Sequence, residues 1–216
     1  MKKFLITIAA AGLFASGANS ADAALGVDFT SPTSTYMVSQ PNTVAGWSFT
    51  ANRDLFVRAL GLYDHEPDLF HPETHSVGLW QADGTLLTSV TVSEPQYPHR
   101  QELVNGKYHM ETTQNILLKA GQTYFVAATM TPDNTFAWFP TLAEAAAHNL
   151  VFDSNLTYGN AQLASSATLT MPTTEMTGIG FFGANIDVVP TPLPAAAWLL
   201  GSGLLGLAGM RRRQQS

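Results

Sequence analysis

The densest polar stretch of the sequence runs from residue 64 to residue 75, with three histidines and four acidic residues in twelve positions. Carboxylates on one loop could ligate Ca²⁺, which takes about six to eight oxygen ligands, whereas histidine nitrogens would suit Zn²⁺. The candidate metal ligands are Asp64, Asp68, His71 and His75. Their spacing matches no named metal motif, because the stretch has neither His-Glu-x-x-His nor the glycine of an EF-hand loop. We therefore expect a solvated acidic loop without a metal or cofactor, and we keep structural Ca²⁺ as the alternative.

A second candidate site is the aromatic run from Thr135 to Pro140, in a predicted loop before a short helical pattern. Exposed aromatic rings can stack on the faces of sugars, which would make Trp138 and Phe139 a glycan contact. Large aromatic side chains are more often buried, so the same two rings could close one end of a β-sheet core. We expect the buried arrangement and keep the glycan contact as the alternative.

Residues that would carry catalysis form no recognisable set. The chain has no Gly-x-Ser-x-Gly nucleophile motif, and no spacing selects one Ser–His–Asp combination. Acidic pairs such as Glu94 and Glu102 would serve a glycosidase only at a defined separation, which a sequence does not set. The motifs therefore predict a protein that is not an enzyme, with a hydrolase as the alternative.

Short strands and turns are the elements that would position these residues. Segments rich in Val, Leu, Phe, Trp and Thr recur at short intervals between turn-forming residues, which is typical of an all-β domain. Several segments are apolar on both faces, so we expect both faces of those strands to be covered. The predicted strands are Ala45–Ala51, Leu55–Tyr63, His75–Ala82, Thr85–Ser93, Tyr108–Thr112, Tyr124–Met130, Ala167–Met171 and Gly178–Val188.

Local motifs predict the turns and a single helix. Asp83-Gly84 stands between two strand-like runs and predicts a two-residue type I′ hairpin. Residues 119–122 predict a second turn. Thr141 followed by Glu144 and three alanines predicts a short helix with a capping box. Together these elements indicate an antiparallel β-sandwich or jelly-roll-like domain with one short helix.

The composition limits the class of protein and its partners. A chain of 216 residues with 45% hydrophobic side chains suits one folded domain with attached tails. Charged residues make up 12%, about half the usual share, and the absence of Cys excludes disulfides and thiolate metal sites. Residues 24–190 hold five basic side chains against 15 acidic ones, and such a surface repels phosphate backbones. We therefore expect no nucleic-acid partner.

The two ends of the chain have the patterns of targeting segments. Two lysines, an apolar run and an Ala-x-Ala site predict a secretory signal peptide over residues 1–23. The β domain would then occupy residues 24–188, and a stiff Pro-rich linker residues 189–194. The uncharged segment Leu193–Met210 is followed by three arginines, which predicts a transmembrane helix with a cytoplasmic end over residues 195–213.

The C-terminal tail resembles the sorting signal of PEP-CTERM proteins, in the variant with the motif Val-Pro-Leu-Pro-Ala. The matching residues are Pro192, Leu193, Pro194, Ala195, Arg211, Arg212 and Arg213. The resemblance implies processing by an exosortase, a membrane-embedded Cys protease of Gram-negative bacteria associated with exopolysaccharide production. It also implies export, transient anchoring in the inner membrane, and release to the cell surface or the extracellular matrix.

The middle of the chain resembles a domain of unknown function that is common in secreted PEP-CTERM proteins. The matching segments are Gly46–Phe49, Ala59–Tyr63, His75–Trp80, Gly84–Leu87, Leu118–Tyr124 and Gly180–Gly183. These are mainly core and turn residues, so the resemblance implies a fold and no activity. The expected function is that of a non-catalytic surface or matrix protein of a biofilm, which contacts exopolysaccharide or other matrix components. The alternative is a secreted hydrolase that acts on matrix glycans.

Overall fold

The computed structural model describes residues 24–30, 37–38, 40–64, 74–93, 103–131, 136–176 and 178–191. All of them fall within one structural unit, Asp22–Thr191. The predicted signal peptide over residues 1–23, the sorting motif at residues 192–195 and the predicted helix over residues 195–213 lie outside the described residues. In the described part of the chain, no helix is long and apolar enough to cross a membrane.

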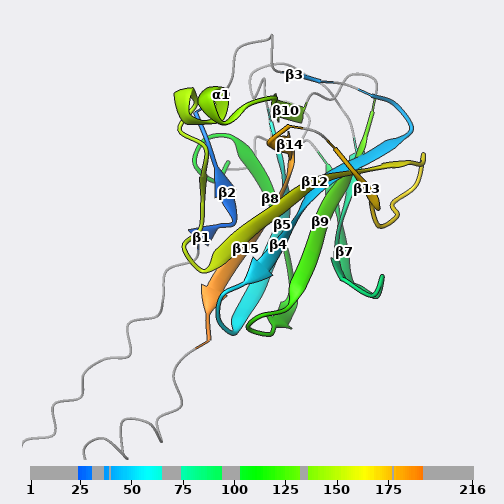
Figure 1. Cartoon of the computed structure of the whole chain (residues 1–216). Coiled ribbons are helices and arrows are strands. Elements are labelled where there is room, and N and C mark those ends of the chain that lie inside the picture. Colours follow the sequence, from blue (N-terminus) through cyan, green and yellow to red (C-terminus); the bar gives the residue numbers. More distant parts are fainter. Residues whose placement is uncertain are drawn as a thin grey trace, which may run out of the picture. The chain divides into compact units, whose positions relative to one another are not determined.

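Two antiparallel sheets pack on each other, with six strands in the larger and four in the smaller (Figure 1). The strand order is β13-β12-β4-β9-β6-β7 in the larger sheet and β1-β15-β5-β8 in the smaller. The larger sheet consists of β4 (Thr43–Ala51), β6 (Thr74–Gln81), β7 (Leu86–Ser93), β9 (Thr123–Met130), β12 (Leu156–Ser165) and β13 (Thr174–Glu175). The smaller sheet consists of β1 (Ala24–Leu25), β5 (Leu55–Tyr63), β8 (Tyr108–Leu118) and β15 (Ala184–Pro190). The predicted class, an all-β antiparallel sandwich-like fold, is confirmed.

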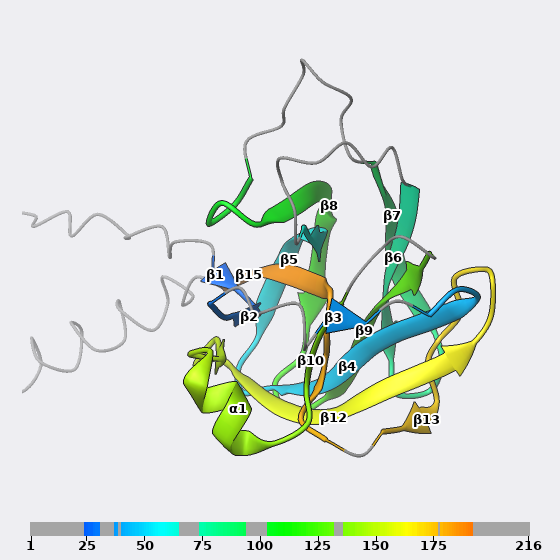
Figure 2. The ribbon, with the colours of Figure 1, turned by 90° about the horizontal axis from the view of Figure 1, so that it is seen from above.

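Short elements lie at one end and along one side of this sandwich. They form two small sheets, with the orders β14-β10-β3 and β11-β2, and one helix. Their bounds are β2 (Val27–Asp28), β3 (Met37–Val38), β10 (Phe136–Phe139), α1 (Leu142–Ala147), β11 (Val151–Phe152) and β14 (Gly180–Phe182). Figures 1 and 2 show α1, β3, β10 and β14 close together at this end.

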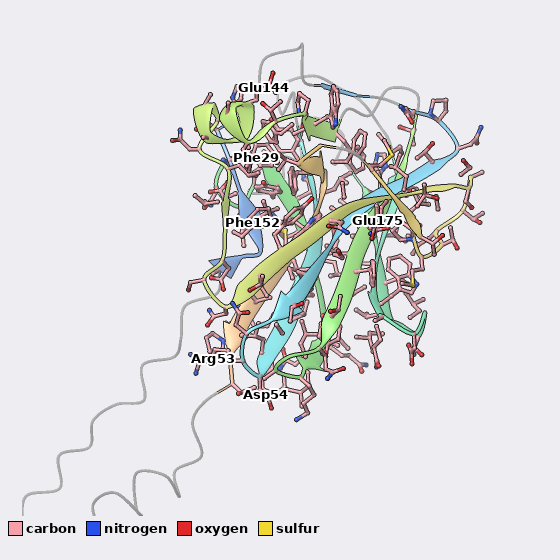
Figure 3. The ribbon with its side chains drawn as sticks, in the orientation of Figure 1. Phe29, Arg53, Asp54, Glu144, Phe152 and Glu175 are labelled. Atoms are coloured by element: carbon pink, nitrogen blue, oxygen red, sulfur yellow. The ribbon has the colours of Figure 1, made fainter. Side chains whose placement is uncertain are left out.

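Aromatic side chains join the two sheets. Trp47 of β4 is fully buried, and its indole Nε1 donates a hydrogen bond to the carbonyl of Ala184 in the smaller sheet at 2.9 Å. The ring of Phe182 lies 5.7 to 6.4 Å from the rings of Trp47, Phe152 and Tyr158. Figure 3 marks the partly buried Phe152 and also Phe29, which is 2% exposed. The stability of the domain therefore rests on large apolar side chains buried between layers.

Strand β4 is buried on both faces, although its residues alternate between apolar and small or polar side chains. On the inner face, Trp47 and Phe49 belong to the main core. On the outer face, Val44 forms a second small cluster with Trp80 and Ala127. Leu169 and Met171, from the segment after β12, pack over this outer cluster and shield it from water.

The predicted short helix and its cap are confirmed. The backbone N–H of Glu144 donates to Oγ1 of Thr141 at 3.3 Å, and α1 follows at Leu142–Ala147. The turn predicted over residues 119–122 also forms, with Gly121 at a φ of +76°. Both features depend on a few adjacent residues, which is why local sequence predicts them.

The predicted two-residue type I′ hairpin at Asp83-Gly84 is wrong. The N–H of Gly84 donates to the carbonyl of Gln81 at 3.1 Å, and the N–H of Gln81 donates to the carbonyl of Thr85 at 2.9 Å. Of the two turn residues only Gly84 has a positive φ, at +91°. The loop is therefore a type I turn closed by a left-handed glycine, a longer connection that also suits the twist of a hairpin.

Several of the predicted strands differ from the observed ones. The strand predicted over Tyr108–Thr112 continues to Leu118 in β8. Residues 167–171 form no strand, and Leu156–Ser165, which the pattern did not predict, forms β12. A bulge between Tyr158 and Ala161 interrupts the alternation of β12 and hides its strand pattern. The predicted strand Gly178–Val188 divides into β14 and β15 at Gly183, where a Cβ atom would lie 2.1 Å from the ring of Phe136.

The first and last strands of the domain are neighbours in the smaller sheet. Ala24 of β1 pairs with Val188 of β15. Strand β15 continues through Val189 and Pro190, so the predicted linker over residues 189–194 begins too early: Val189 is 9% exposed and packs as part of the domain. The N–H of Thr191 then donates to the carbonyl of Asp54 at 3.1 Å. Figure 3 shows Asp54 at the end of the domain opposite to α1.

Candidate functional site

Asp64 and His109 form a buried polar pair where β5 ends beside β8. In the ladder, Leu62 lies opposite His109, so Asp64 follows two residues later on the same face. Oδ2 of Asp64 lies 3.0 Å from Nε2 of His109, and the two side chains are 11% and 8% exposed. The N–H of Asp64 also donates to the carbonyl of Lys107 at 2.8 Å. A carboxylate on one ring nitrogen fixes the orientation of a histidine, which is a feature of many acid–base sites.

A second polar group lies next to this pair. Nζ of Lys107 is 2.7 Å from Oδ1 of Asp28 and also donates to the carbonyl of Phe29. Nδ2 of Asn105 donates to the other carboxylate oxygen of Asp28 at 3.0 Å. These contacts tie Asp28 of β2 and the following Phe29 to the turn before β8. They satisfy the charge of a lysine that is largely buried, which explains its place beside the core.

Tyr108 lies beneath this polar group and is 1% exposed. Burial raises the pKa of its phenol well above the usual range, and the negative charge of Asp28 raises the pKa further. Tyr108 therefore keeps its proton at physiological pH. Its ring packs at 5.8 Å against the ring of Tyr63, its partner across the β5–β8 ladder, so its role is in packing.

The two predicted metal ligands that the structure describes have different hydrogen-bond partners. His75 lies in β6 with 0% of its surface exposed, and its Nδ1 is 2.9 Å from the carbonyl of Thr129. Asp64 pairs with His109 on the smaller sheet. Asp68 and His71 lie outside the described residues. Within the described ranges, no three side chains of His, Asp or Glu converge in a way that could hold a metal ion.

Trp138 and Phe139 lie in strand β10, not in the predicted loop. Phe139 is 0% exposed, and its ring packs 5.6 Å from Phe29 and 6.0 Å from Phe182. Trp138 is only partly buried, and its ring stacks on Phe181 with 6.3 Å between centroids and 22° between planes. Phe139 therefore belongs to the core, and of these two rings only Trp138 offers surface to a ligand.

Sequence reasoning missed the partnership of Asp64 and His109, because the two residues are 45 positions apart and only the β5–β8 register joins them. A catalytic triad would need a nucleophile at the second nitrogen of the histidine. Nδ1 of His109 is buried and has no hydrogen-bond partner among the described residues. The part of the chain that the structure describes thus offers an oriented histidine without a nucleophile.

Comparison with known proteins identifies no relative of this chain. No family model, curated protein or solved structure matches the chain. The function must therefore follow from the residues themselves. They supply a partly exposed Trp138, an enclosed Asp64–His109 pair, and strand ends at Ala24 and Pro190 that lie on neighbouring strands.

Proposed function

We propose that this chain is an exported surface or extracellular-matrix protein of a Gram-negative bacterium, processed by an exosortase-type protease. The observation that carries the proposal is the tail, with its motif at residues 192–195, its uncharged segment up to Met210, and Arg211–Arg213. The positive residues would keep the C-terminus in the cytoplasm, which leaves the β domain on the outer side of the inner membrane. The Ala-x-Ala pattern of the predicted signal peptide agrees with that orientation.

The arrangement of the strands at the two ends of the domain supports this proposal. Because Ala24 pairs with Val188, β1 begins where β15 ends, and the domain is entered and left at one end of the smaller sheet. A domain exported between a signal peptide and a transient inner-membrane anchor has both of its ends at the membrane. Strand β10, which carries Trp138, lies at the opposite end, together with α1 (Figure 1).

The role we infer is contact with exopolysaccharide or another matrix component, without catalysis. The partly exposed ring of Trp138 is the described side chain that best suits the apolar face of a sugar. A secreted hydrolase acting on matrix glycans is the rival function. It would use an oriented base such as His109, whose side chain is 8% exposed and would have to reach its substrate.

Processing is tested with the full chain carrying an epitope tag after Ser216 and a second epitope in the exposed β6–β7 hairpin. In a strain with an active exosortase, we expect the C-terminal tag to be lost and the hairpin epitope to appear at the surface or in the medium. Alanine at Pro192, Leu193 and Pro194 should block this loss and leave full-length protein in the inner membrane. Persistence of tagged wild-type protein in that membrane contradicts the proposal.

Glycan contact is tested by applying the released domain to an array of bacterial polysaccharides, followed by product analysis on every glycan that binds. Binding without turnover supports the matrix role, and turnover supports the hydrolase. The matched variants are Trp138→Ala, which should remove binding, and Leu142→Ala, which changes an exposed residue of α1 at the same end and should leave binding intact. A domain that binds no matrix polysaccharide or matrix protein contradicts the inferred role.

A further inference from the structure

The two main sheets have four edge strands, and an edge strand presents unpaired N–H and C=O groups to which another chain can add. Three of the four edges carry a usual protection against such pairing. Strands β1 and β13 are two residues long, and β13 ends in Glu175. Strand β8 contains Glu111 and a register shift opposite Val57 and Ala59, which bends the edge.

Strand β7 is the exception among the edges that the structure describes. It spans eight residues, Leu86–Ser93, and contains no charge, no proline and no glycine. It pairs with β6 on one side, and no strand in the described ranges pairs with its other side, although β8 of the smaller sheet lies nearby. Figure 2 shows β7 as the outermost strand of the larger sheet, beyond β6. Leu86 is 48% exposed, and Ser89 and Thr91 are also exposed.

The charge distribution favours this edge as the contact site between two copies of the chain. Apart from His75, which is fully buried in β6, the six strands of the larger sheet contain a single acidic or basic side chain, Glu175, which lies on the opposite edge (Figure 3). The chain as a whole has a formal net charge of −6, so its copies repel one another over most approaches. Two β7 strands approach without that repulsion, and their Thr and Ser side chains form favourable cross-strand pairs.

We propose that β7 is an association edge at which a second copy of this chain adds its own β7. A twofold axis perpendicular to the sheet makes the two strands antiparallel and joins two six-stranded sheets into one continuous sheet. The partner is another copy, because β7 carries no charge along its whole length and so does not repel a second β7. This inference goes beyond export and glycan contact, and it stands or falls independently of them.

The absence of Cys makes disulfide trapping a direct test on the full chain in mild detergent. Cysteine is placed at Ser89, at Thr91, or at both, which covers the three antiparallel registers in which Ser89 faces Ser89, Thr91 faces Thr91, or Ser89 faces Thr91 of the second copy. The control is Ser165→Cys, an exposed position near the other edge of the same sheet. We expect a disulfide-linked dimer in at least one of the β7 variants and a much lower yield in the control, since only facing strands bring two Cα atoms within disulfide distance.

A charge variant gives a second measurement that does not depend on oxidation. Thr91→Lys puts like charges near each other across the twofold axis, and we expect the dissociation constant from sedimentation to rise about tenfold or more. Ser165→Lys is the matched control and should leave association unchanged. Thr91 is exposed, so the melting temperature serves as a check that the fold is retained. A wild-type chain that stays monomeric, a dimer unaffected by Thr91→Lys, or trapping no stronger than in the control overturns the proposal.

Discussion

The side-chain amide of Asn185 makes the two hydrogen bonds to Val27 that a neighbouring strand would otherwise make. Oδ1 of Asn185 accepts from the N–H of Val27 at 3.1 Å, and Nδ2 donates to the carbonyl of Val27 at 2.8 Å. Asn185 is 0% exposed and Val27 is 1% exposed, so neither backbone group is left to water. One amide therefore holds β2 against β15 and satisfies both backbone polar groups of Val27.

Asn185→Asp should destabilise the domain by about 2–4 kcal/mol, because a buried carboxylate cannot donate to the carbonyl of Val27 and lies near Asp28. Urea unfolding followed by tryptophan fluorescence measures the loss. Asn115→Asp, on the exposed face of β8, adds the same charge and should change stability by less than about 0.5 kcal/mol. Equal effects at the two positions would contradict the role given to the Asn185 amide.

Trp138→Ala should lower stability by about 1–3 kcal/mol, because the ring stacks on Phe181 and packs against the core but is partly exposed. Phe139→Ala removes a fully buried ring and should cost about 3–5 kcal/mol. Thermal unfolding of the two variants beside the wild type measures the difference. A larger loss at Trp138 than at Phe139 would mean that Trp138 closes the core and has no surface for a ligand.

Asp187→Asn should make the domain slightly more stable at pH 7, by less than about 1 kcal/mol. Burial raises the pKa of Asp187 above its ordinary value of 3.8, and Arg58 offsets only part of that effect. A raised pKa favours the folded state at low pH, and this contribution is lost as the pH rises past the raised value. The gain of the variant should therefore vanish below pH 4, in unfolding experiments from pH 3 to pH 7. Arg58→Gln should have the opposite effect at pH 7.

Asp64→Ala and His109→Ala should each be destabilising, by about 1–3 kcal/mol, because each leaves a buried polar partner without its bond. The double variant should lose less stability than the sum of the two single variants, because it leaves neither polar side chain of the pair buried without a partner. A double-mutant cycle in urea measures this coupling. Additive losses would show that the 3.0 Å contact contributes nothing to stability.

Features that depend on a few adjacent residues are predictable from this sequence. The strand Leu55–Tyr63 has the predicted bounds because its apolar run is interrupted only by Arg58 and ends at an aspartate on each side. Thr141 and Glu144 predict the cap of α1 because all the atoms of that motif lie within one turn. The all-β class follows from the same kind of local pattern.

Features that depend on distant segments are not predictable in this way. Ala167, Leu169 and Met171 alternate like a strand, yet Leu169 and Met171 cover the outer cluster around Trp80. The bulge in β12 disrupts the alternation that would identify the strand. The contact of Asp64 with His109 exists only in the β5–β8 register, which no local pattern specifies.

The pairing of β1 with β15 also sets when the domain can fold. Val27 and Asn185 are 158 positions apart, and β15 lies between β1 and β5 in the smaller sheet. A chain made from its N-terminus holds β1, β2 and β5 long before the strand that joins them exists. The smaller sheet thus stays incomplete until almost the last residue of the domain is made, and contacts of such long range form slowly. If the chain is exported as we propose, a channel that threads unfolded chains would receive it before the smaller sheet is complete.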